Sequence, residues 1–561
     1  MPERTGRFAL VEQLLADGIT YMFGNPGTVE QGFLDAVEEF SDFKYIMSLQ
    51  ESVAVAMADG YARATKKPAL VQLHSGVGLG NGIGMMYQAM RGHAPLIVVT
   101  GEAGIRYDAM DAQMAADLVS MARPVTKWAT RVVDPGSVLR VLRRAIKIAA
   151  TPPMGPVFVC LPADVLDAPN QEPIGPTSFP TTEVAPAPAE LERVADLLVD
   201  ARHPMIIVGD GVAYAHAQDE LTRVAELLGA EVWGADAGEV NISSMHPLYK
   251  GALGHMFGGS SSKLTTKADA VLIVGTYVFP EVFPNLEDVF APEAKIVHID
   301  LNAYEIAKNF PVHMGIVSNP KLTLAGLAEV LDHKLSDSQK QAAHQRMEAS
   351  GAVNQAAVEQ QLDHDRSVRN AMPMYASRFM EELAKHVPQD VMIFDEALTV
   401  SPDVTRYLPP TRPDHFFQTR GGSLGVGIPG ALGIKLAHPD KTVIGFTGDG
   451  GSMYTIQALW TAAHYNIGAK FVICNNQSYM LLKLNILQYW QEQVGVEVHE
   501  FPHSFDLGKP VIDFAGLSRA MGVPAVRVDR PEDVESAVKQ MLEHDGPFVV
   551  DLVITNRVPG M

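Results

Sequence analysis

Two short runs of glycine and polar residues near the end of the chain each follow an apolar, strand-like segment directly. The run GDGGS (448–452) follows KTVIGFT, and the run NNQSY (475–479) follows KFVICN. Open α/β sheets bind ligands outside the carboxyl ends of their strands. We therefore expect both runs to lie at one ligand site.

The residue types in these runs suit a metal-bound diphosphate. Asp449, Asn476 and the backbone carbonyl of residue 478 supply the kind of oxygen ligands that Mg²⁺ takes when phosphates complete its octahedron. The two glycines let the backbone approach an anion, and the segment 453–465 has the pattern of a helix whose first N–H groups favour negative charge. Gly-Asp-Gly alone is common in tight turns, so the pairing with Asn-Asn carries the prediction.

This pairing resembles the signature of thiamine-diphosphate (ThDP) enzymes, and the resemblance extends over almost the whole chain. It is closest to the benzoylformate decarboxylase family, within the wider group of pyruvate decarboxylase and acetolactate synthase. The resemblance implies ThDP and Mg²⁺ as cofactors, with Asp449, Asn476 and Ser478 as metal ligands. The cofactor-binding residues that it implies in these runs are Asp449, Gly450, Gly451, Ser452, Asn476, Ser478 and Tyr479.

Glu51 follows the strand-like segment KYIMSL and begins a helical pattern. An acid at a helix start is often only a complement to the helix dipole. Its context, SLQESVAVAMADGYARA (48–64), resembles the catalytic-glutamate helix of the family. The resemblance implies that Glu51 hydrogen-bonds N1′ of the aminopyrimidine and favours the imino tautomer that deprotonates the thiazolium, a task suited to a buried carboxyl.

Another part of the implied cofactor site is the glycine-rich segment TRGGSLGVGIPGALG (419–433). A lone leucine is a core residue by default, but the resemblance places Leu424 under the bent cofactor, where it holds the two rings close together. It also implies that the backbone of Gly422 contacts the pyrimidine. Leu398 and Thr399 match the loop that meets the diphosphate from its other side.

Two residues of the first section are candidates for contact with substrate. His74, in QLHSGVGLGNGIG, matches a family histidine that transfers protons, and imidazole titrates near neutrality. A lone histidine is otherwise usually a surface or satisfied core residue. Thr28, in FGNPGTVEQGF, matches an active-site serine and could bind a carboxylate, or it could simply cap the following helix.

The chain also departs from the family pattern. The second catalytic histidine is expected in the segment 280–285, which reads PEVFPN and offers Glu281 and Phe283 instead. Gln113 stands nearest to the place of the pyruvate decarboxylase histidine pair. With one histidine instead of two, carboligation gains ground against protonation.

The segment that follows the metal motif has two interpretations. Leu481, Leu484 and Asn485 fall on a predicted helix, where they are either core residues or walls of a substrate pocket. His499 and His503 lie in an irregular stretch that is either a lid or plain surface.

Length and alternation predict an α/β protein with three doubly wound parallel-sheet modules. We expect a pyrimidine-binding domain at 1–170, a central domain at 189–333 and a diphosphate-binding domain at 371–556. In the family, two modules from different subunits enclose one cofactor, so the resemblance implies a homodimer as the minimum and a homotetramer as the common state. Gly209 and Gly211 form only half of a dinucleotide fingerprint, so we expect a packing turn and no FAD.

Composition narrows the partners. Lys and Arg total 44 against 65 Asp and Glu, a formal charge of −21, which argues against nucleic acid and anionic membranes. Cys160 and Cys474 lie in apolar strand-like runs and predict no disulfide. No segment has the length and apolarity of a membrane span or signal peptide, and we expect a cytoplasmic enzyme.

The reaction implied by the resemblance is decarboxylation of a 2-oxo acid, with release of an aldehyde or ligation to an aldehyde acceptor that gives a 2-hydroxy ketone. The alternatives are an acetolactate-synthase-like enzyme, a 2-hydroxyacyl-CoA lyase-like enzyme, and a non-catalytic binding subunit with the ThDP fold. The presence of Glu51, Asp449 and Asn476 together speaks against the last.

Overall fold

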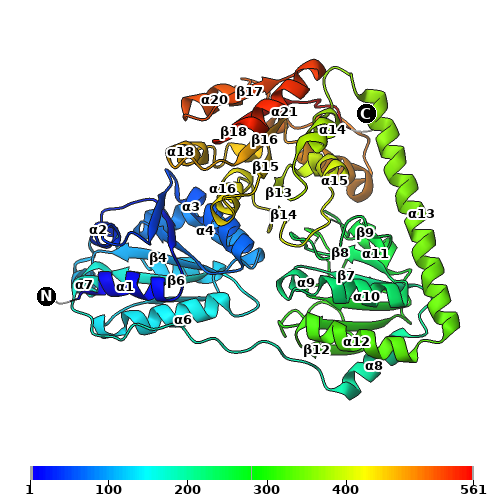
Figure 1. The fold of residues 1–561 in the computed structure, drawn as a ribbon, viewed down its shortest axis with the longest axis horizontal. Coiled ribbons are helices and arrows are strands. Elements are labelled where there is room, and N and C mark those ends of the chain that lie inside the picture. Colours follow the sequence, from blue (N-terminus) through cyan, green and yellow to red (C-terminus); the bar gives the residue numbers. More distant parts are fainter. Residues whose placement is uncertain (1–3, 255, 280, 559–561) are drawn as a thin grey trace. The chain divides into compact units, whose positions relative to one another are not determined.

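The computed structural model describes residues 4–254, 256–279 and 281–558 (Figure 1). It contains three six-stranded sheets flanked by helices, with parallel strand pairing, which confirms the predicted fold class. The chain divides into two compact units: Met1–Pro180, Ala371–Ser401 and Thr419–Met561 form one, and Thr181–Asn370 and Pro402–Gln418 form the other. The boundaries expected for three domains stay a prediction.

The first sheet has the strand order β2-β1-β3-β4-β6-β5. Its central strands are apolar and buried along their whole length, as strands covered on both faces must be. Helices α1 and α6 pack on one face, and α3 and α4 lie on the other (Figure 1). The strands are β1 (Tyr21–Gly24), β2 (Lys44–Met47), β3 (Ala69–Leu73), β4 (Leu96–Glu102), β5 (Trp128–Arg131) and β6 (Val157–Pro162). The helices are α1 (Gly6–Ala16), α2 (Gln31–Val37), α3 (Glu51–Thr65), α4 (Ser75–Arg91), α5 (Leu118–Ala122), α6 (Val138–Ala150) and α7 (Ala163–Asp167).

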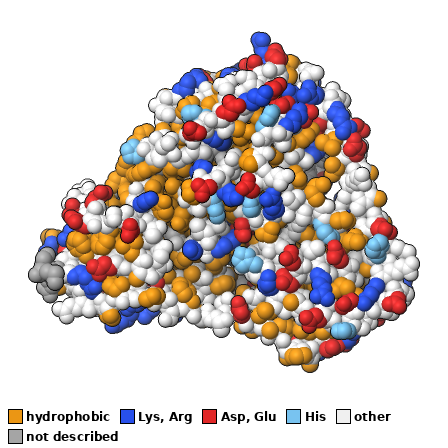
Figure 2. Space-filling view, in the orientation of Figure 1, with side chains coloured by type: hydrophobic (Ala, Val, Ile, Leu, Met, Phe, Trp, Pro, Cys, Tyr) orange, Lys and Arg blue, Asp and Glu red, His pale blue; other side chains and the backbone are white. Residues whose placement is uncertain are grey.

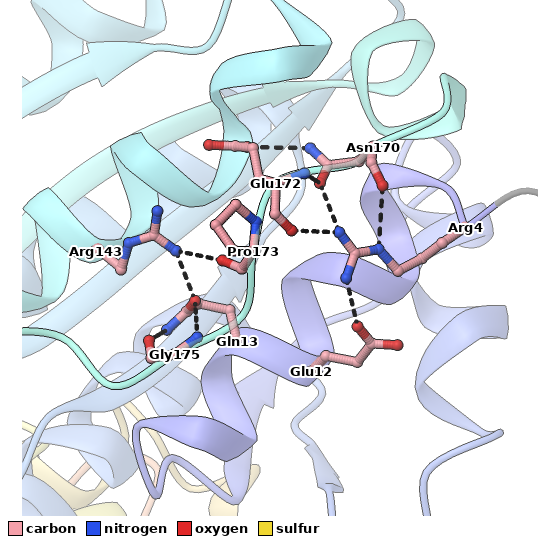
Figure 3. Close-up of polar contacts among 8 residues, drawn as sticks. All are labelled: Arg4, Glu12, Gln13, Arg143, Asn170, Glu172, Pro173 and Gly175. Carbon is pink, nitrogen blue, oxygen red and sulfur yellow. Dashed lines mark hydrogen bonds and ion pairs between the residues drawn. The ribbon is translucent and has the colours of Figure 1, made fainter.

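The chain leaving this sheet is held against α1 and α6 by polar contacts (Figure 3). Arg4 donates to the carbonyl of Asn170 at 3.1 Å and to the carboxylate of Glu12 at 3.0 Å. Further on, Gln13 donates to the carbonyl of Gly175 at 2.7 Å, and Arg143 donates to Gln13 at 2.8 Å. The first residues of this connecting segment are therefore fixed in place although they form no helix or strand.

The second sheet, in the other unit, has the order β12-β11-β10-β7-β8-β9, with α8, α10 and α12 packed on one face. A Cβ atom added at Gly211 would lie 2.5 Å from the Cα of Gly275, so the glycine turn after β7 serves close packing. The polar segment after α12 forms the long helix α13 (Asp337–Val368). The strands are β7 (Pro204–Val208), β8 (Glu231–Gly234), β9 (Tyr249–Ala252), β10 (Ala270–Val274), β11 (Lys295–Asp300) and β12 (Met314–Val317). The other helices are α8 (Pro188–Leu198), α9 (Gly211–Tyr214), α10 (Gln218–Leu228), α11 (Gly259–Thr265) and α12 (Pro320–Lys334).

The strands of the third sheet within the first unit run in the order β13-β15-β16-β18-β17. The single helix predicted at 453–465 is wrong: a four-residue helix, α17 (Asp449–Ser452), is followed by turns, and α18 begins only at Ala458. The strands are β13 (Met392–Glu396), β14 (Phe416–Gln418), β15 (Val443–Gly448), β16 (Lys470–Asn475), β17 (Ala525–Val528) and β18 (Phe548–Val553). The helices are α14 (Ala376–His386), α15 (Ser401–Tyr407), α16 (Gly427–Ala437), α18 (Ala458–His464), α19 (Met480–Gln488), α20 (Phe514–Ala520) and α21 (Val534–Glu543).

Helices α3 and α16 pack backbone against backbone. A Cβ atom added at Gly60 would lie 2.2 Å from the carbonyl oxygen of Gly430, and one added at Gly433 would lie 2.0 Å from that of Met57. Only glycine fits such a crossing. Because α3 begins at Glu51 and α16 begins in the glycine-rich segment, this contact fixes the two helix starts relative to each other.

Acidic and basic side chains are interspersed over one face of the molecule, and hydrophobic side chains gather on its left part (Figure 2). Both cysteines are buried and free, as predicted. No helix among the described residues combines the length and the apolarity that crossing a membrane requires.

The α3–α16 crossing makes a prediction about stability. We expect Gly433→Ala to lower the free energy of unfolding by at least about 2 kcal/mol, because the new methyl overlaps backbone atoms that cannot move separately. Gly259→Ala is the matched control, since a Cβ there, in α11, meets nothing within 4 Å. Urea unfolding of both variants measures the effect, and equal stability of Gly433→Ala and the parent would contradict the close packing.

Candidate active site

Glu51 occupies the first position of α3 with both carboxylate oxygens engaged. Asn25 donates to Oε1 at 3.2 Å, and Asn81 donates to Oε2 at 3.0 Å. The side chain of Gln50 accepts from the amide of Ser52 and so caps the helix in its place. The Glu51 carboxyl is buried and held by neutral amides from the loop after β1 and from α4, so its orientation is fixed without an ionic partner.

His74 stands at the end of β3 and is paired with a buried acid. Its Nδ1 lies 2.8 Å from Oε2 of Glu30, whose other oxygen accepts from the amide of Gly101 at 2.7 Å. A Cβ atom added at Gly78 would lie 3.1 Å from Oε1 of Glu51 and 3.3 Å from Cβ of His74. His74 and Glu51, the two predicted catalytic residues, therefore border the same small space.

Thr28 and Gln113 have exposed side chains. The interpretation of Thr28 as a helix cap is wrong, because α2 begins at Gln31 with Glu30 in the N-cap position. The alternative, a hydroxyl that meets substrate, stays a prediction.

Asp449 and Asn476 are brought together by one backbone amide. The N–H of Ser478 donates to Oδ2 of Asp449 at 3.3 Å and to Oδ1 of Asn476 at 2.9 Å. These two oxygens therefore lie on the same side of one N–H group and close to each other. All three residues are buried, and burial raises the pKa of Asp449 to about 6 although backbone N–H groups oppose the rise. A cation beside these oxygens would favour the ionised carboxylate.

The glycine turn next to Asp449 packs against aromatic and acidic neighbours. A Cβ atom added at Gly450 would lie 2.3 Å from the ring of Tyr479, and one added at Gly451 would lie 3.0 Å from Oε1 of Glu396. Ser452 is buried and donates from its hydroxyl to the carbonyl of Asp449. The backbone of the turn is therefore closely packed and leaves no room for side chains at these two positions.

Glu396, at the end of β13, is a buried acid that joins three parts of this region. Its carboxylate accepts from the amides of Gly425 and Gly427 and from the hydroxyl of Thr447. Burial raises the pKa of Glu396 to about 7, with the backbone N–H groups opposing. One side chain thus ties the glycine-rich segment to the ends of β13 and β15.

The predicted loop residues flank this acid. Leu398 and Thr399 follow it in a short 3₁₀ helix, and Leu424 and Gly422 lie in the glycine-rich segment, where Gly422 has a φ of 70°. The base of that segment is fixed by Gln88 of α4, which accepts from the amide of Arg420 at 2.7 Å. The structure brings these residues to the same end of the sheet as Asp449.

Three non-glycine residues in the left-handed region mark the same loops. Ser75 has a φ of 44°, Leu398 of 51° and Gln477 of 56°. Each lies beside a predicted site residue: His74, Thr399 or Asn476. Such conformations cost about 1–3 kcal/mol each and concentrate at functional sites.

The segment after the metal motif begins as α19 and continues as one turn of π-helix over Tyr489–Val494. Leu481, Leu484 and Asn485 are all half-buried, which separates neither the core nor the pocket interpretation. His499 packs on the ring of Trp490 at 4.0 Å between centroids, whereas His503 is exposed and has no such contact.

Four residues that contact the predicted ones were missed by sequence reasoning: Asn25, Glu30, Asn81 and Glu396. Three of them stand in the quoted runs FGNPGTVEQGF and LHSGVGLGNGIG, where polar residues between glycines were the available signal. Glu396 ends an apolar strand, the same position that singled out Asp449.

The residues present fit a thiamine diphosphate with its metal. Converging carboxylate and amide oxygens suit a hard cation, and the side-chain-free turn at Gly450 and Gly451 suits the diphosphate. The buried carboxyl of Glu51 suits a hydrogen-bond partner for the ring. This agreement rests on the described residues alone.

Comparison with known proteins gives an independent result. Three models of the thiamine pyrophosphate enzyme family match the chain: the N-terminal TPP binding domain at residues 4–121, the central domain at 191–327 and the C-terminal TPP binding domain at 399–552. The resemblance inferred from the sequence is thereby confirmed.

Full-length relatives agree with this match. The chain is 30% identical to a benzoylformate decarboxylase of Pseudomonas aeruginosa over 98% of both chains, and 28% identical to a probable acetolactate synthase large subunit of Methanococcus aeolicus over 98% of this chain and 92% of that one. It is also similar to the structure of a putative thiamin diphosphate-dependent enzyme from Mycobacterium smegmatis, with a TM-score of 0.84, 30% identity and 99% coverage of both. The chain belongs to the family of thiamine-diphosphate-dependent enzymes that includes benzoylformate decarboxylase and acetolactate synthase.

Proposed function

We propose that the protein uses thiamine diphosphate and Mg²⁺ to decarboxylate a 2-oxo acid, and that it can also ligate the product to an aldehyde acceptor. The observation that carries the proposal is the pair of prepared half-sites: the buried Glu51 held by two amides, and the Asp449 and Asn476 oxygens that share one backbone donor. A non-catalytic binding protein would need neither.

The chain's residues have separate tasks in this proposal. Thiamine diphosphate, when bound, supplies a nucleophilic carbon and a ring that accepts electrons as CO₂ leaves. Glu51 would exchange a proton with the ring at its carboxyl, Asp449, Asn476 and Ser478 would hold the metal, and the turn at Gly450 and Gly451 would hold the diphosphate. Leu424 and Gly422 would support the rings, with Leu398 and Thr399 on the other side of the diphosphate.

His74 and Thr28 are the proposed contacts to substrate. The imidazole can give and take a proton near neutral pH, and the exposed hydroxyl of Thr28 can donate to a carboxylate. An aromatic 2-oxo acid is supported by the benzoylformate decarboxylase relative, and an aliphatic one by the acetolactate synthase relative.

Carboligation is supported by the residue that replaces the second histidine. Glu281 is buried, and its carboxylate accepts a hydrogen bond from the hydroxyl of Ser261. This side chain is therefore already engaged by a neighbour in its own part of the chain. Without a second imidazole to deliver a proton, an intermediate has more time to meet an acceptor. An acetolactate-synthase-like reaction is therefore the second candidate.

We also propose that two copies of the chain complete each site. Large hydrophobic side chains are exposed around both half-sites, and such patches are typical of interfaces. A homodimer is the minimum in this proposal and a homotetramer its common form. The exposed residues are Leu49 and Val77, near Glu51 and His74 in sequence, and Met453, Tyr454 and Leu482, beside the two metal-motif runs. Met114 is also exposed, and its carbonyl accepts from the hydroxyl of Ser75, next to His74.

The proposed activity is tested by removing cofactor and metal with a chelator, then adding ThDP and Mg²⁺ separately and together. We expect CO₂ release from a panel that includes benzoylformate and pyruvate only when both are present. Glu51→Gln should lower kcat at least about 100-fold, because the carboxyl that holds the proton is lost. A Glu51→Gln enzyme as fast as the parent would refute the assignment.

The shared site is tested by mixing two inactive variants. Glu51→Gln and Asp449→Asn damage different half-sites, so a mixed dimer has one intact site and one doubly damaged site. After unfolding and refolding an equal mixture, we expect about one quarter of the parent activity, since half of the dimers are mixed. Activity no greater than that of the separate variants would show that both half-sites belong to one chain.

Glu396 predicts a pH dependence of stability without cofactor. Its pKa in the folded protein, about 7, lies above the ordinary value of 4.5, so its contribution is full below about pH 4.5 and lost as pH rises through 7. Between pH 5 and 8 the unfolding free energy of the parent should fall relative to Glu396→Gln by an amount on the order of 3 kcal/mol.

The control for this experiment is Asp108→Asn. Hydrogen bonds from Arg131 lower the pKa of Asp108, so its contribution is lost only in acid. Its difference from the parent should be constant from pH 5 to 8. Parallel stability curves for the parent and Glu396→Gln would contradict the prediction for Glu396.

A further inference from the structure

Glu30 lies at the start of a helix but does not use its side chain to cap it. It occupies the N-cap position of α2, but its carboxylate makes no capping hydrogen bond to that helix. Instead it reaches the ring of His74 and the amide of Gly101, which are distant in sequence. The side chain is only 4% exposed, so this is not a solvated surface contact.

The acid is held so that one oxygen is reserved for the imidazole. Oε1 accepts from the amide of Gly101 at 2.7 Å and from that of Ser75 at 3.4 Å, while Oε2 lies 2.8 Å from Nδ1 of His74. An ionised carboxylate can only accept hydrogen bonds, so Nδ1 beside it must be the donor. In the neutral ring the lone pair is then on Nε2.

Glycines make room for this pair. A Cβ atom added at Gly101 would lie 2.8 Å from Oε1 of Glu30, and one added at Gly27 would lie 2.0 Å from Nδ1 of His74. Neither side of the pair can accept a larger residue without displacing it. The contact is therefore built into the backbone of the loop after β1 and of the end of β4.

We propose that Glu30 is a positioning residue that fixes His74 in the tautomer with hydrogen on Nδ1, so that Nε2 is the atom that takes or gives a proton. One proton moves to or from Nε2, and the hydrogen bond from Nδ1–H to Oε2 of Glu30 is kept throughout. A buried carboxylate beside the ring also stabilises the imidazolium while the proton is held. The proton-transfer role of His74 rests on the proposed function, but its tautomer does not.

The decisive variant is Glu30→Gln, which keeps the shape. The amide of Gly101 needs an acceptor, so the Gln oxygen takes the Oε1 position and its NH₂ group faces Nδ1. A donor there forces Nδ1 to accept, and the hydrogen of the neutral ring moves to Nε2. We expect ¹⁵N-histidine NMR of the protein without cofactor to show the Nδ1–H tautomer for His74 in the parent and the Nε2–H tautomer in Glu30→Gln.

Kinetics provide the second measurement. With the best 2-oxo acid, Glu30→Gln should lower kcat about 10- to 100-fold with little change in KM, and it should have no further effect in a His74→Ala background. Glu172→Gln is the matched control, because that carboxylate also accepts from two backbone amides, those of Leu139 and Arg140, in the same sheet layer. It should change neither the His74 signal nor kcat.

The outcomes separate this proposal from the proposed function. An Nε2–H tautomer in the parent, or an unchanged signal in a folded Glu30→Gln, would overturn the role of Glu30 whatever the enzyme does. If no 2-oxo acid is turned over but the tautomers behave as expected, the proposed function fails and the positioning by Glu30 stands. Since the first result needs only the parent protein, a Glu30→Gln variant that does not fold leaves the proposal testable.

Discussion

The close crossing of α3 and α16 is the constraint on which the candidate site depends. Gly60, Gly430 and Gly433 remove the side chains that would otherwise separate the two backbones. Each helix then starts at a functional loop, α3 at Glu51 and α16 at the glycine-rich segment. Packing that cannot slide gives each loop end a fixed position in its own chain, and in the two-copy proposal each of them then contributes to a different one of the two sites.

The acids of the site are held in a common way. Glu51 accepts from side-chain amides, while Glu396 and Asp449 accept from backbone N–H groups. Such donors fix a carboxylate precisely in direction yet leave its charge without a counterion, and burial raises the pKa of both Glu396 and Asp449. The strained residues Ser75 and Gln477 show that the surrounding loops pay a conformational cost to present these groups.

Much of this arrangement could be predicted from the sequence, because it depends on local order along the chain. Parallel strands end at one edge of a sheet, so polar residues directly after β15 and β16 had to meet there. Contacts between distant loops could not be predicted in the same way. Glu30 and His74 stand in separate motifs, and only the folded loops after β1 and β3 show that they touch.

The helix predicted at 453–465 was wrong for a related reason. The residues at 453–465 have helical propensity, but the chain after β15 first forms the short helix α17. It then turns, and the next helix, α18, begins only at Ala458. The buried backbone of this turn, not a long helix axis, is what faces the proposed anion.

The charges at the candidate site bear on whether the proposed cofactor could be anchored without the proposed metal. Among the described residues, Glu396 and Asp449 accept hydrogen bonds from N–H and hydroxyl groups and not from Lys or Arg, so either carboxylate, when ionised, has no counterion. Backbone N–H groups of one short turn carry only partial positive charge, which is too little to neutralise a diphosphate in a buried place. In the proposed function, a divalent cation held by Asp449 and Asn476 would supply the missing charge. Anchoring of the proposed cofactor would then depend on the metal, because in the part of the chain that the structure describes neither Glu396 nor Asp449 is paired with Lys or Arg.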